Sequence, residues 1–280
     1  MIKKYFIFPS INPIIYSIGS INFRWYGLMY IIGFFFIFFN SKKKIYKLKI
    51  KFSKKKIDDL LYYGFLGALI GGRLGYILFY NINFFLKNPL NIFYIYNGGM
   101  SFHGGLIGVI FIIFKFSKKN KNIFFSITDI ISPLIPFSLG LGRIGNFINC
   151  ELIGRITLNT PWAILFTNSQ KEDLIAIKNS IVLKKIYKIY GSLPRHPSQI
   201  YEFILEGVLL FIILNIYKNK KNNIGKISSL FLIIYSIFRI FIEFFRQPDI
   251  QLGLFFNFLS IGQILTFPML IIGTYIFLKK

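Results

Sequence analysis

Residues Gly142 to Arg155 read GRIGNFINCELIGR, and apolar stretches long enough to cross a bilayer lie on both sides of them. These fourteen residues include two arginines, one glutamate, two asparagines and three glycines. Inserting a charged side chain at the centre of a membrane helix costs about 2.5–3.5 kcal/mol, so such residues usually mark a ligand pathway or a site. The stretch therefore predicts a polar functional site at the end of a membrane-spanning helix.

The composition is typical of a membrane protein, because 54% of the 280 residues are hydrophobic and 19% are aromatic. We predict one all-α membrane domain over residues 1–280, with seven transmembrane helices. Because Pro9, Asn12 and Pro13 interrupt the first apolar run, we expect no cleaved signal peptide. The predicted spans lie near residues 22–39, 58–80, 101–116, 126–145, 198–217, 228–245 and 256–278.

The net charge of +24 comes from lysines that are concentrated in particular connections between the spans. With seven spans these connections all lie on one side, which the positive-inside rule assigns to the cytoplasm. The N-terminus is then outside, the C-terminus is cytoplasmic, and residues 146–196 form a small extracytoplasmic lobe. The lysines indicate topology and attraction to anionic membrane lipid rather than a nucleic-acid surface. They lie at Lys42 to Lys56, Lys115 to Lys121, Lys218 to Lys226, and Lys279 with Lys280.

Cysteine and histidine are too few for a disulfide or a recognisable metal site. Cys150 is the single cysteine, and the two histidines, His103 and His196, are far apart in the sequence. No spacing resembles a structural zinc site. We expect neither a metal nor a cofactor.

The third predicted span is short and begins with a histidine. Ser101 is a good N-cap, and the run from there to Phe116 is about 22 Å of helix against a hydrocarbon core of about 30 Å. His103 falls in the first turn, where the positive end of the helix dipole favours the neutral imidazole. It is a candidate general base. The alternative is a hydrogen-bonded interior histidine, but the neighbouring Gly104 and Gly105 leave room for a ligand.

Charged residues also mark the predicted fifth and sixth spans. Glu202 and Glu206 are one turn apart, so they share a helix face and need cations or water. Arg239 and Glu243 have the spacing of an intrahelical pair, which could be purely structural. Arg246 is one further turn along and remains unpaired by this spacing.

Ten polar or charged residues fall at or near the predicted outer ends of the helices, whereas the lysines are concentrated at the opposite ends. Taken singly, Tyr26 could be an interfacial anchor and Arg73 a snorkelling side chain. Together they predict one polar cavity near the outer leaflet, and its arginines favour a phosphate-bearing ligand. The residues are Tyr26, Arg73, His103, Arg143, Asn146, Glu151, Glu202, Arg239, Glu243 and Arg246.

Several motifs resemble the prolipoprotein diacylglyceryl transferase family, and they cover nearly the whole chain in the family's order. Two positions depart from the family pattern, since Cys150 stands where glycine is usual and Ile153 where an aromatic residue is usual. A glycine at 150 could serve a positive φ, so Cys150 bears on the local turn. The motifs are Trp25 to Leu28, Gly71 to Tyr76, Ser101 to Gly105, Gly142 to Asn149 with Glu151 and Gly154, Pro197 to Glu202, and Arg239 with Glu243 and Arg246.

The resemblance implies a multi-pass enzyme of the bacterial inner membrane. It would transfer the diacylglyceryl group of phosphatidylglycerol to the lipobox cysteine of a preprolipoprotein, forming a thioether and releasing glycerol phosphate. The implied catalytic residues are His103, Arg143, Arg239, Glu151 and Glu243. The implied contacts with phosphatidylglycerol are Arg143, Tyr26, Asn146, Arg239, Tyr235, Arg246, Arg73, Glu202 and Gly154.

Two alternatives remain open at the level of the sequence. An Arg–Glu pair could activate the substrate thiol in place of His103. The protein could also be a transporter or channel for an anionic solute, although the two halves of the chain show no internal repeat of the kind common in transporters.

Overall fold

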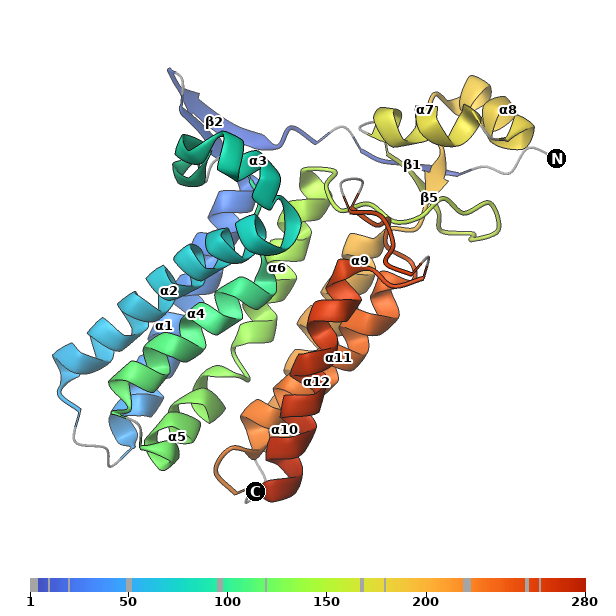
Figure 1. Cartoon of the computed structure of the whole chain (residues 1–280). Helices are drawn as coiled ribbons and strands as arrows, with labels where there is room; N and C mark the ends of the chain where they lie inside the picture. The colour runs from blue at the N-terminus through green and yellow to red at the C-terminus, as the bar shows by residue number, and fades with distance from the viewer. Residues whose placement is uncertain are drawn as a thin grey trace.

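A bundle of helices carries a small lobe at one end (Figure 1). The structure is a computed structural model, and it describes residues 5–9, 11–19, 21–48, 52–94, 98–118, 120–166, 169–178, 180–218, 223–249, 252–256 and 258–280. The bundle contains α1 (Trp25–Lys47), α2 (Lys54–Tyr80), α4 (Phe102–Phe116), α5 (Lys121–Ile131), α6 (Ile135–Ile148), α9 (Ser198–Glu202), the π-helical turn η4 (Phe203–Leu209), α10 (Leu210–Lys218), α11 (Lys226–Glu243) and α12 (Ile261–Lys279).

By length and composition, three of the described helices could cross a membrane, and a bent pair could form a fourth span. The three are Lys54–Tyr80, Ser198–Lys218 and Ile261–Lys279, and the pair α5–α6 is bent by 46°. Pro133 and Pro136 lie at this bend, where the missing backbone N–H groups weaken the helix. These prolines account for the bend, while the count of seven spans stays a prediction.

Glycines bring α2 and α4 into backbone contact. A Cβ atom on Gly67 would lie 2.9 Å from the carbonyl oxygen of Gly108, and one on Gly71 would overlap the carbonyl of Gly104. Only glycine allows this approach. Gly67, Gly71 and Gly75 are four residues apart, and small residues at this spacing favour close contact between membrane helices. The contact fixes the start of α4, where the hydroxyl of Ser101 accepts the N–H of Gly104 at 3.3 Å, as its N-cap position predicted.

Several helix boundaries differ from the predicted spans, and two of the differences have a clear local cause. The first helix continues past residue 39 to Lys47, because lysines are good helix formers and Lys44 and Lys47 lie in its last turn, where the helix dipole favours cations. The last helix begins at Ile261 rather than near 256, because Ser260 and Gln263 form a capping box there.

Two hydrophobic clusters hold the bundle together. One contains Ile45, Leu60, Ile113 and Ile127 and joins α1, α2, α4 and α5. The other contains Leu214, Phe231 and Met269, among others, and joins α10, α11 and α12. The two clusters stabilise the two sides of the bundle, and the polar residues described below lie toward one end.

The lobe end of the bundle contains short strands, so the all-α prediction is wrong in this detail. Strands of two to five residues are too short to show a periodic pattern in the sequence. β1 pairs with β4 in parallel, β4 pairs with β5 antiparallel, and β2 and β3 form a separate antiparallel pair. The elements at this end are β1 (Phe6–Ile7), β2 (Ile14–Ile18), β3 (Ile21–Arg24), α3 (Ile82–Lys87), η1 (Pro89–Phe93), β4 (Ile164–Leu165), α7 (Gln170–Lys178), α8 (Ile181–Tyr190) and β5 (Pro194–Arg195).

The helix ends that adjoin the lysine-rich connections lie at the opposite end of the bundle, which we call the lysine end (Figure 1). α1, α4, α10 and α12 end there, and α2, α5 and α11 begin there. Asp129 also lies there and accepts the N–H groups of Gly225 and Ser228, so it caps the start of α11. Lys49, Lys51, Lys119, Lys220 and Lys221 lie outside the described residues.

Candidate active site

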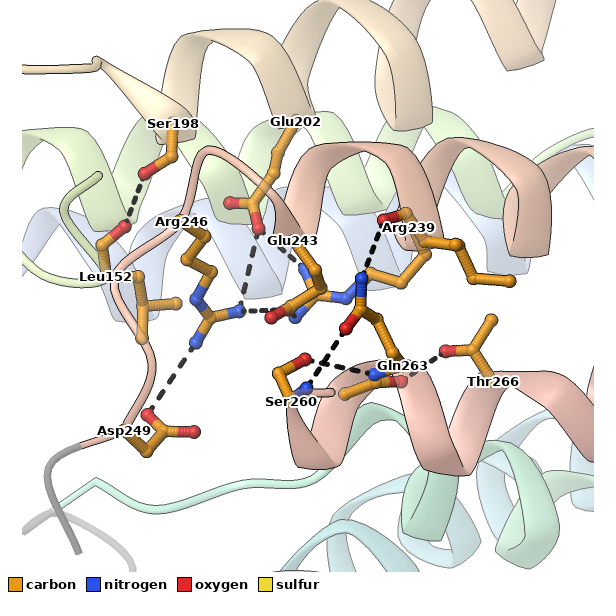
Figure 2. A network of polar contacts seen from close by, with 12 residues as sticks. Leu152, Ser198, Glu202, Arg239, Glu243, Arg246, Asp249, Ser260, Gln263 and Thr266 are labelled. Atoms are coloured by element: carbon orange, nitrogen blue, oxygen red, sulfur yellow. Dashed lines mark hydrogen bonds and ion pairs between the residues drawn. The ribbon is translucent and has the colours of Figure 1, made fainter. Parts of the chain in front are cut away.

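Three arginines and three glutamates from α6, α9–η4, α11 and the segment just after α11 meet near the lobe end. We call them the arginine cluster: Arg143, Arg239, Arg246, Glu202, Glu206 and Glu243. Glu202 contacts all three arginines, and its side chain is fully buried. Its Oε1 lies 2.6 Å from Nη1 of Arg239 and 3.6 Å from Nη1 of Arg246, while its Oε2 lies 3.3 Å from Nη1 of Arg143. Figure 2 shows Glu202 beside Arg239 of α11 and Arg246, which follows the end of α11.

The other two glutamates complete the pairing. Oε2 of Glu206 lies 3.0 Å from Nη2 of Arg143, and its Oε1 lies 3.7 Å from Nη1 of Arg239. Oε1 of Glu243 accepts a hydrogen bond from Nη2 of Arg239 and lies 3.5 Å from Nη1 of Arg246. Three guanidinium groups and three carboxylates in mutual contact offset much of the desolvation cost that each charge alone would carry.

Close helix packing brings Arg143 to this cluster. A Cβ atom on Gly207 would lie 2.8 Å from the Cα of Gly140, so α6 and η4 touch through their backbones. Arg143 is almost one turn after Gly140 and reaches Glu206, one residue before Gly207. The backbone from Phe203 to Leu209 is π-helical, and π-helical turns are frequent at functional sites.

His103 lies in the first turn of α4 and contacts α12. Its Nε2 is 3.2 Å from Oγ1 of Thr266, whose hydroxyl donates to the carbonyl oxygen of Gly262 at 2.6 Å. Because a threonine hydroxyl has one proton, Nε2 of His103 is the donor in this contact. A neutral imidazole then carries its basic lone pair on Nδ1, where a proton can be accepted.

The start of α12 connects His103 to the arginine cluster. A Cβ atom on Gly262 would lie 2.7 Å from Oε1 of Glu243 and 3.3 Å from Nη2 of Arg239. Gln263 donates from Nε2 to the carbonyl oxygen of Ile240 at 3.2 Å, which fixes α12 to α11 (Figure 2). The packing of α4, α11 and α12 thus places His103 at the same end of the bundle as Arg239 and Glu243, with Thr266 and Gly262 of α12 between them.

Two tyrosines lie beside the cluster. Tyr235 is 1% exposed and stacks on Phe102 with ring centroids 4.4 Å apart. Tyr26 packs against α6, because a Cβ atom on Gly145 would lie 2.9 Å from its ring. Its hydroxyl donates to that of Tyr30 at 3.0 Å.

Glu151 lies apart from the arginines. Its Oε2 accepts Nδ2 of Asn146 at 3.5 Å and its Oε1 accepts Nδ2 of Asn149 at 3.3 Å, and the residue is exposed. It forms no ion pair within the described part of the chain. Its predicted catalytic role, which includes orienting an arginine, stays a prediction.

Gly154 lies where the lobe meets α11. Its N–H donates to the carbonyl oxygen of His196 at 3.1 Å, and it forms a β-bridge with Arg246. A Cβ atom here would overlap the backbone of His196. The position therefore requires glycine, and its packing aligns the chain that carries Arg246.

The guanidinium of Arg73 donates hydrogen bonds to backbone carbonyl oxygens rather than to the glutamates of the arginine cluster. Its guanidinium donates to the carbonyl oxygens of five residues: Asn91, Ile92, Tyr94, Gly98 and Gly99. These bonds hold the segment that leads into α4. The predicted contact of Arg73 with phosphatidylglycerol stays a prediction.

A cavity of about 240 Å³ opens beside Arg246, with Tyr76, Tyr80 and Asp249 among its lining residues. Nη2 of Arg246 lies 3.9 Å from Oδ1 of Asp249 (Figure 2). Among the residues that the structure describes, no group of three or more histidine, cysteine, aspartate or glutamate side chains is arranged to hold a metal ion.

Sequence reasoning missed the contribution of α12. Ser260, Gln263 and Thr266 are buried polar residues that support the cluster or His103. The pattern Ser-x-x-Gln at 260–263 is a capping-box signal, and it could have located the start of the helix. Glu206 was recognised as sharing a face with Glu202 but was not included among the site residues.

The comparisons with known proteins decide the family. The model of the prolipoprotein diacylglyceryl transferase family matches residues 13–279. The chain belongs to this family. Among its relatives, the phosphatidylglycerol–prolipoprotein diacylglyceryl transferase of Proteus mirabilis (strain HI4320) is 55% identical over 271 residues, which is 96% of this chain and 92% of the relative.

Other members of the prolipoprotein diacylglyceryl transferase family agree. The proteins of the same name from Serratia proteamaculans (strain 568) and Sodalis glossinidius (strain morsitans) are 52% and 50% identical over 273 residues, covering 98% of this chain and 94% of each relative. Membership in this family, with the apolar helices, identifies the chain as a mostly helical membrane protein and a transferase.

Proposed function

We propose that this protein transfers the diacylglyceryl group of phosphatidylglycerol to the lipobox cysteine of a preprolipoprotein. The products are a thioether on the peptide and glycerol phosphate. The observation that carries the proposal is the contact of Glu202 with three arginines inside a buried cluster. The names of the relatives supply the substrates, and no observation favours the anionic-solute transporter.

The arginines suit a leaving group that gains charge during the reaction. The thiol sulfur attacks the glycerol carbon that bears the phosphate, so a C–S bond forms and a C–O bond breaks. The electron pair of that bond leaves with the phosphate oxygen. Arg143 and Arg239 are already oriented by Glu202, Glu206 and Glu243, so they can stabilise this charge without reorganising. Guanidinium groups also match phosphate oxygens geometrically.

The thiol proton needs an acceptor, because an ordinary cysteine has a pKa near 8.5 and is largely protonated at neutral pH. We propose that Nδ1 of His103 accepts it, since Nε2 is engaged with Thr266. The rival is an Arg–Glu pair of the cluster. A His103→Gln variant that inserts normally and transfers lipid at the parent rate would exclude His103 as the base.

Other residues would bind the lipid or position the catalytic groups. Tyr26, Tyr235 and Asn146 would hold polar groups of phosphatidylglycerol. Glu202 and Glu243 hold the arginines in place, while Gly154 aligns Arg246. Arg73, Arg246 and Glu151 are proposed as further contacts with the substrates or the catalytic groups.

We also propose that seven helices cross the bacterial inner membrane, with the N-terminus outside and the C-terminus in the cytoplasm. The separation of the lysine end from the lobe supports this topology. Residues 146–196 would then be an extracytoplasmic lobe of one membrane domain. Single cysteines introduced at Lys188 and Lys55, in a Cys150→Ala background, test it, because only the first should react with an impermeant maleimide added to intact spheroplasts.

A direct assay of the reaction tests the function. Purified full-length protein is incubated with phosphatidylglycerol labelled in its diacylglyceryl part and with a lipobox peptide. Label attached to the peptide cysteine through a thioether supports the proposal, and a Cys→Ser peptide is the control. Uptake of an anionic solute into protein-containing vesicles, with no label on the peptide, would support the transporter instead.

A further inference from the structure

A second cavity lies at the lysine end, away from the arginine cluster. Its volume is about 550 Å³, within the range of roughly 300–1,000 Å³ that is usual for small-molecule sites. α4, α5 and α12 form its walls, and Phe114, Phe125 and Tyr275 are among the aromatic residues that line it. In Figure 1, α5 and the C-terminal end of α12 lie at the end of the bundle opposite the lobe.

Three lysines, Lys121, Lys279 and Lys280, line the same cavity. Nζ of Lys279 donates to the hydroxyl of Tyr275 at 3.0 Å, and Nζ of Lys280 lies 4.9 Å from the centroid of the Phe125 ring. The ammonium groups of Lys279 and Lys280 are thus held at an aromatic wall, where cation–π attraction stabilises them. The cavity combines a large apolar surface with three positive charges.

These charges are not neutralised by acidic side chains. Among the described residues, none of the three lysines forms an ion pair with an aspartate or a glutamate. Asp129 of α5 interacts electrostatically with Lys280, but its two carboxylate oxygens accept the backbone N–H groups of Gly225 and Ser228. The cavity therefore keeps a positive potential that can attract an anion.

The walls and the charges together indicate an amphiphilic ligand. Basic pockets between membrane helices bind anionic lipid headgroups, and aromatic walls bind acyl chains through apolar contact. We propose that this cavity binds an anionic phospholipid, with its phosphate at Lys121, Lys279 and Lys280 and an acyl chain along Phe114 and Phe125. The site is separate from the arginine cluster, and the proposal does not rest on the transferase reaction.

Binding of phosphatidic acid tests the proposal. The full-length protein in detergent micelles is titrated with dioleoyl phosphatidic acid, and bound lipid is counted by native mass spectrometry. The variant K121Q/K279Q/K280Q should bind at least tenfold more weakly than the parent, and the parent's affinity should fall as salt is raised. The matched control K43Q/K47Q/K55Q removes the same charge from exposed lysines at the same end and should weaken binding less than twofold.

Equal losses in the two triple variants would overturn the proposal, because the attraction would then be a general effect of charge. Binding of dioleoyl phosphatidylcholine as tight as that of phosphatidic acid would also overturn it. A second measurement uses the parent protein alone: a photoactivatable phosphatidic acid should crosslink to peptides from residues 114–125 and 275–280. Adducts found only at the lobe end would place the lipid at the arginine cluster and exclude this site.

Discussion

Two sets of buried ion pairs lie in different regions of this molecule, and they differ in how completely their polar atoms are bonded. In the lobe, Asp173 and Arg195 are 0% and 1% exposed. Oδ1 of Asp173 accepts Nε and Nη2 of Arg195, and Oδ2 accepts the N–H of Leu193 and the hydroxyl of Ser169. Arg195 also donates from Nη1 to the carbonyl oxygen of Gly154. The lobe pair is closed, with no carboxylate oxygen left for a ligand.

The arginine cluster is bonded less completely. Oε2 of Glu202 and Oε1 of Glu206 are buried, and neither has a hydrogen-bond partner among the described residues, although arginines lie 3.3 and 3.7 Å away. Arg143, Arg239 and Arg246 each keep a small exposed fraction. The cluster therefore has polar atoms that are not yet fully hydrogen-bonded, unlike the lobe pair.

The difference teaches that burial of charge alone does not mark function. A closed pair such as Asp173–Arg195 leaves no carboxylate oxygen for a ligand, whereas the arginines that share Glu202 stay partly exposed and can meet a substrate phosphate in the orientation they already have. The closed pair should therefore control stability, and the open cluster should control the reaction.

Removing one cation from the cluster should have the largest effect on activity. Arg143→Gln takes away a guanidinium that would stabilise the departing phosphate, and losing one such donor usually costs about 10²–10³ in rate. We expect the initial rate of lipid transfer to fall at least 100-fold, measured with labelled phosphatidylglycerol and a lipobox peptide.

Arg24→Gln is the matched control, because Arg24 is exposed at the start of α1 and its side chain makes no cap hydrogen bond. Its rate should stay within twofold of the parent. If the transfer rate of Arg143→Gln stayed within tenfold of the parent rate, the cluster would stabilise the fold, as the lobe pair does, and would not serve the reaction.

Breaking the lobe pair should lower the stability of the lobe strongly and change the transfer rate little. Asp173→Asn leaves Arg195 buried without a carboxylate, and removing one partner of a buried pair costs about 3–5 kcal/mol. The lobe should be cleaved much faster in limited proteolysis, while the transfer rate of the intact protein at low temperature should stay within tenfold of the parent.

Glu172→Gln changes the neighbouring acidic residue, which is not part of the pair, and should leave the proteolysis rate nearly unchanged. Parent-like resistance of Asp173→Asn would show that the lobe does not depend on this pair. A 100-fold loss of transfer with an intact lobe would instead assign Asp173 to the reaction.

A substitution at Gly154 should affect both regions, because Gly154 accepts Nη1 of Arg195 and pairs with the chain at Arg246. In Gly154→Ala the new methyl group overlaps the backbone of His196, and such overpacking costs about 1–3 kcal/mol. We expect a transfer rate about tenfold lower and a lower unfolding temperature.

Gly191→Ala is the comparison within the lobe. Gly191 ends α8 at φ +73°, and no atom lies near a Cβ placed there, so alanine should lower stability through backbone strain alone. Its transfer rate should remain that of the parent. Equal losses of rate in the two variants would mean that the lobe acts through its stability and not through the position of Arg246.

Local spacing in the sequence predicted part of this architecture. Glycines four residues apart indicated that another helix packs closely on α2, and the spacing of Arg239 and Glu243 indicated their pairing. Both inferences rest on the regular geometry of one helix. Topology put the predicted arginines and glutamates at one depth of the membrane. The structure brings Arg143, Arg239, Arg246, Glu202 and Glu243 together, whereas Arg73 and Glu151 have other partners.

Contacts between distant segments could not be predicted in the same way. Asp173 and Arg195 are 22 residues apart on either side of α8, and His103 meets Thr266 across 163 residues. β1, which lies near the N-terminus, pairs with β4 of the lobe. The π-helical turn at Phe203–Leu209 includes Gly207, which packs on Gly140 of α6, a contact that no local pattern specifies.

The smallest effect is expected at Cys150, which connects the end of α6 to Glu151. Cys150 has φ +54°, a conformation that costs a residue with a Cβ about 1–2 kcal/mol. The family pattern of glycine at this position is consistent with that backbone. Cys150→Gly removes the strain but adds about 0.4–1 kcal/mol of chain entropy to the unfolded state. We expect an unfolding temperature equal to or slightly above that of the parent, with unchanged transfer.

Cys150→Ala separates the thiol from the backbone, because alanine keeps the Cβ and should give no gain in stability. The thiol itself should be inert, since burial, with a smaller contribution from Glu151, raises the pKa of Cys150 to about 11. Alkylation by a maleimide should be slow at pH 7.5 and should accelerate as the pH rises toward 11, because only the thiolate reacts. Rapid alkylation at neutral pH that stops transfer would instead place Cys150 in the active site, together with the arginine cluster.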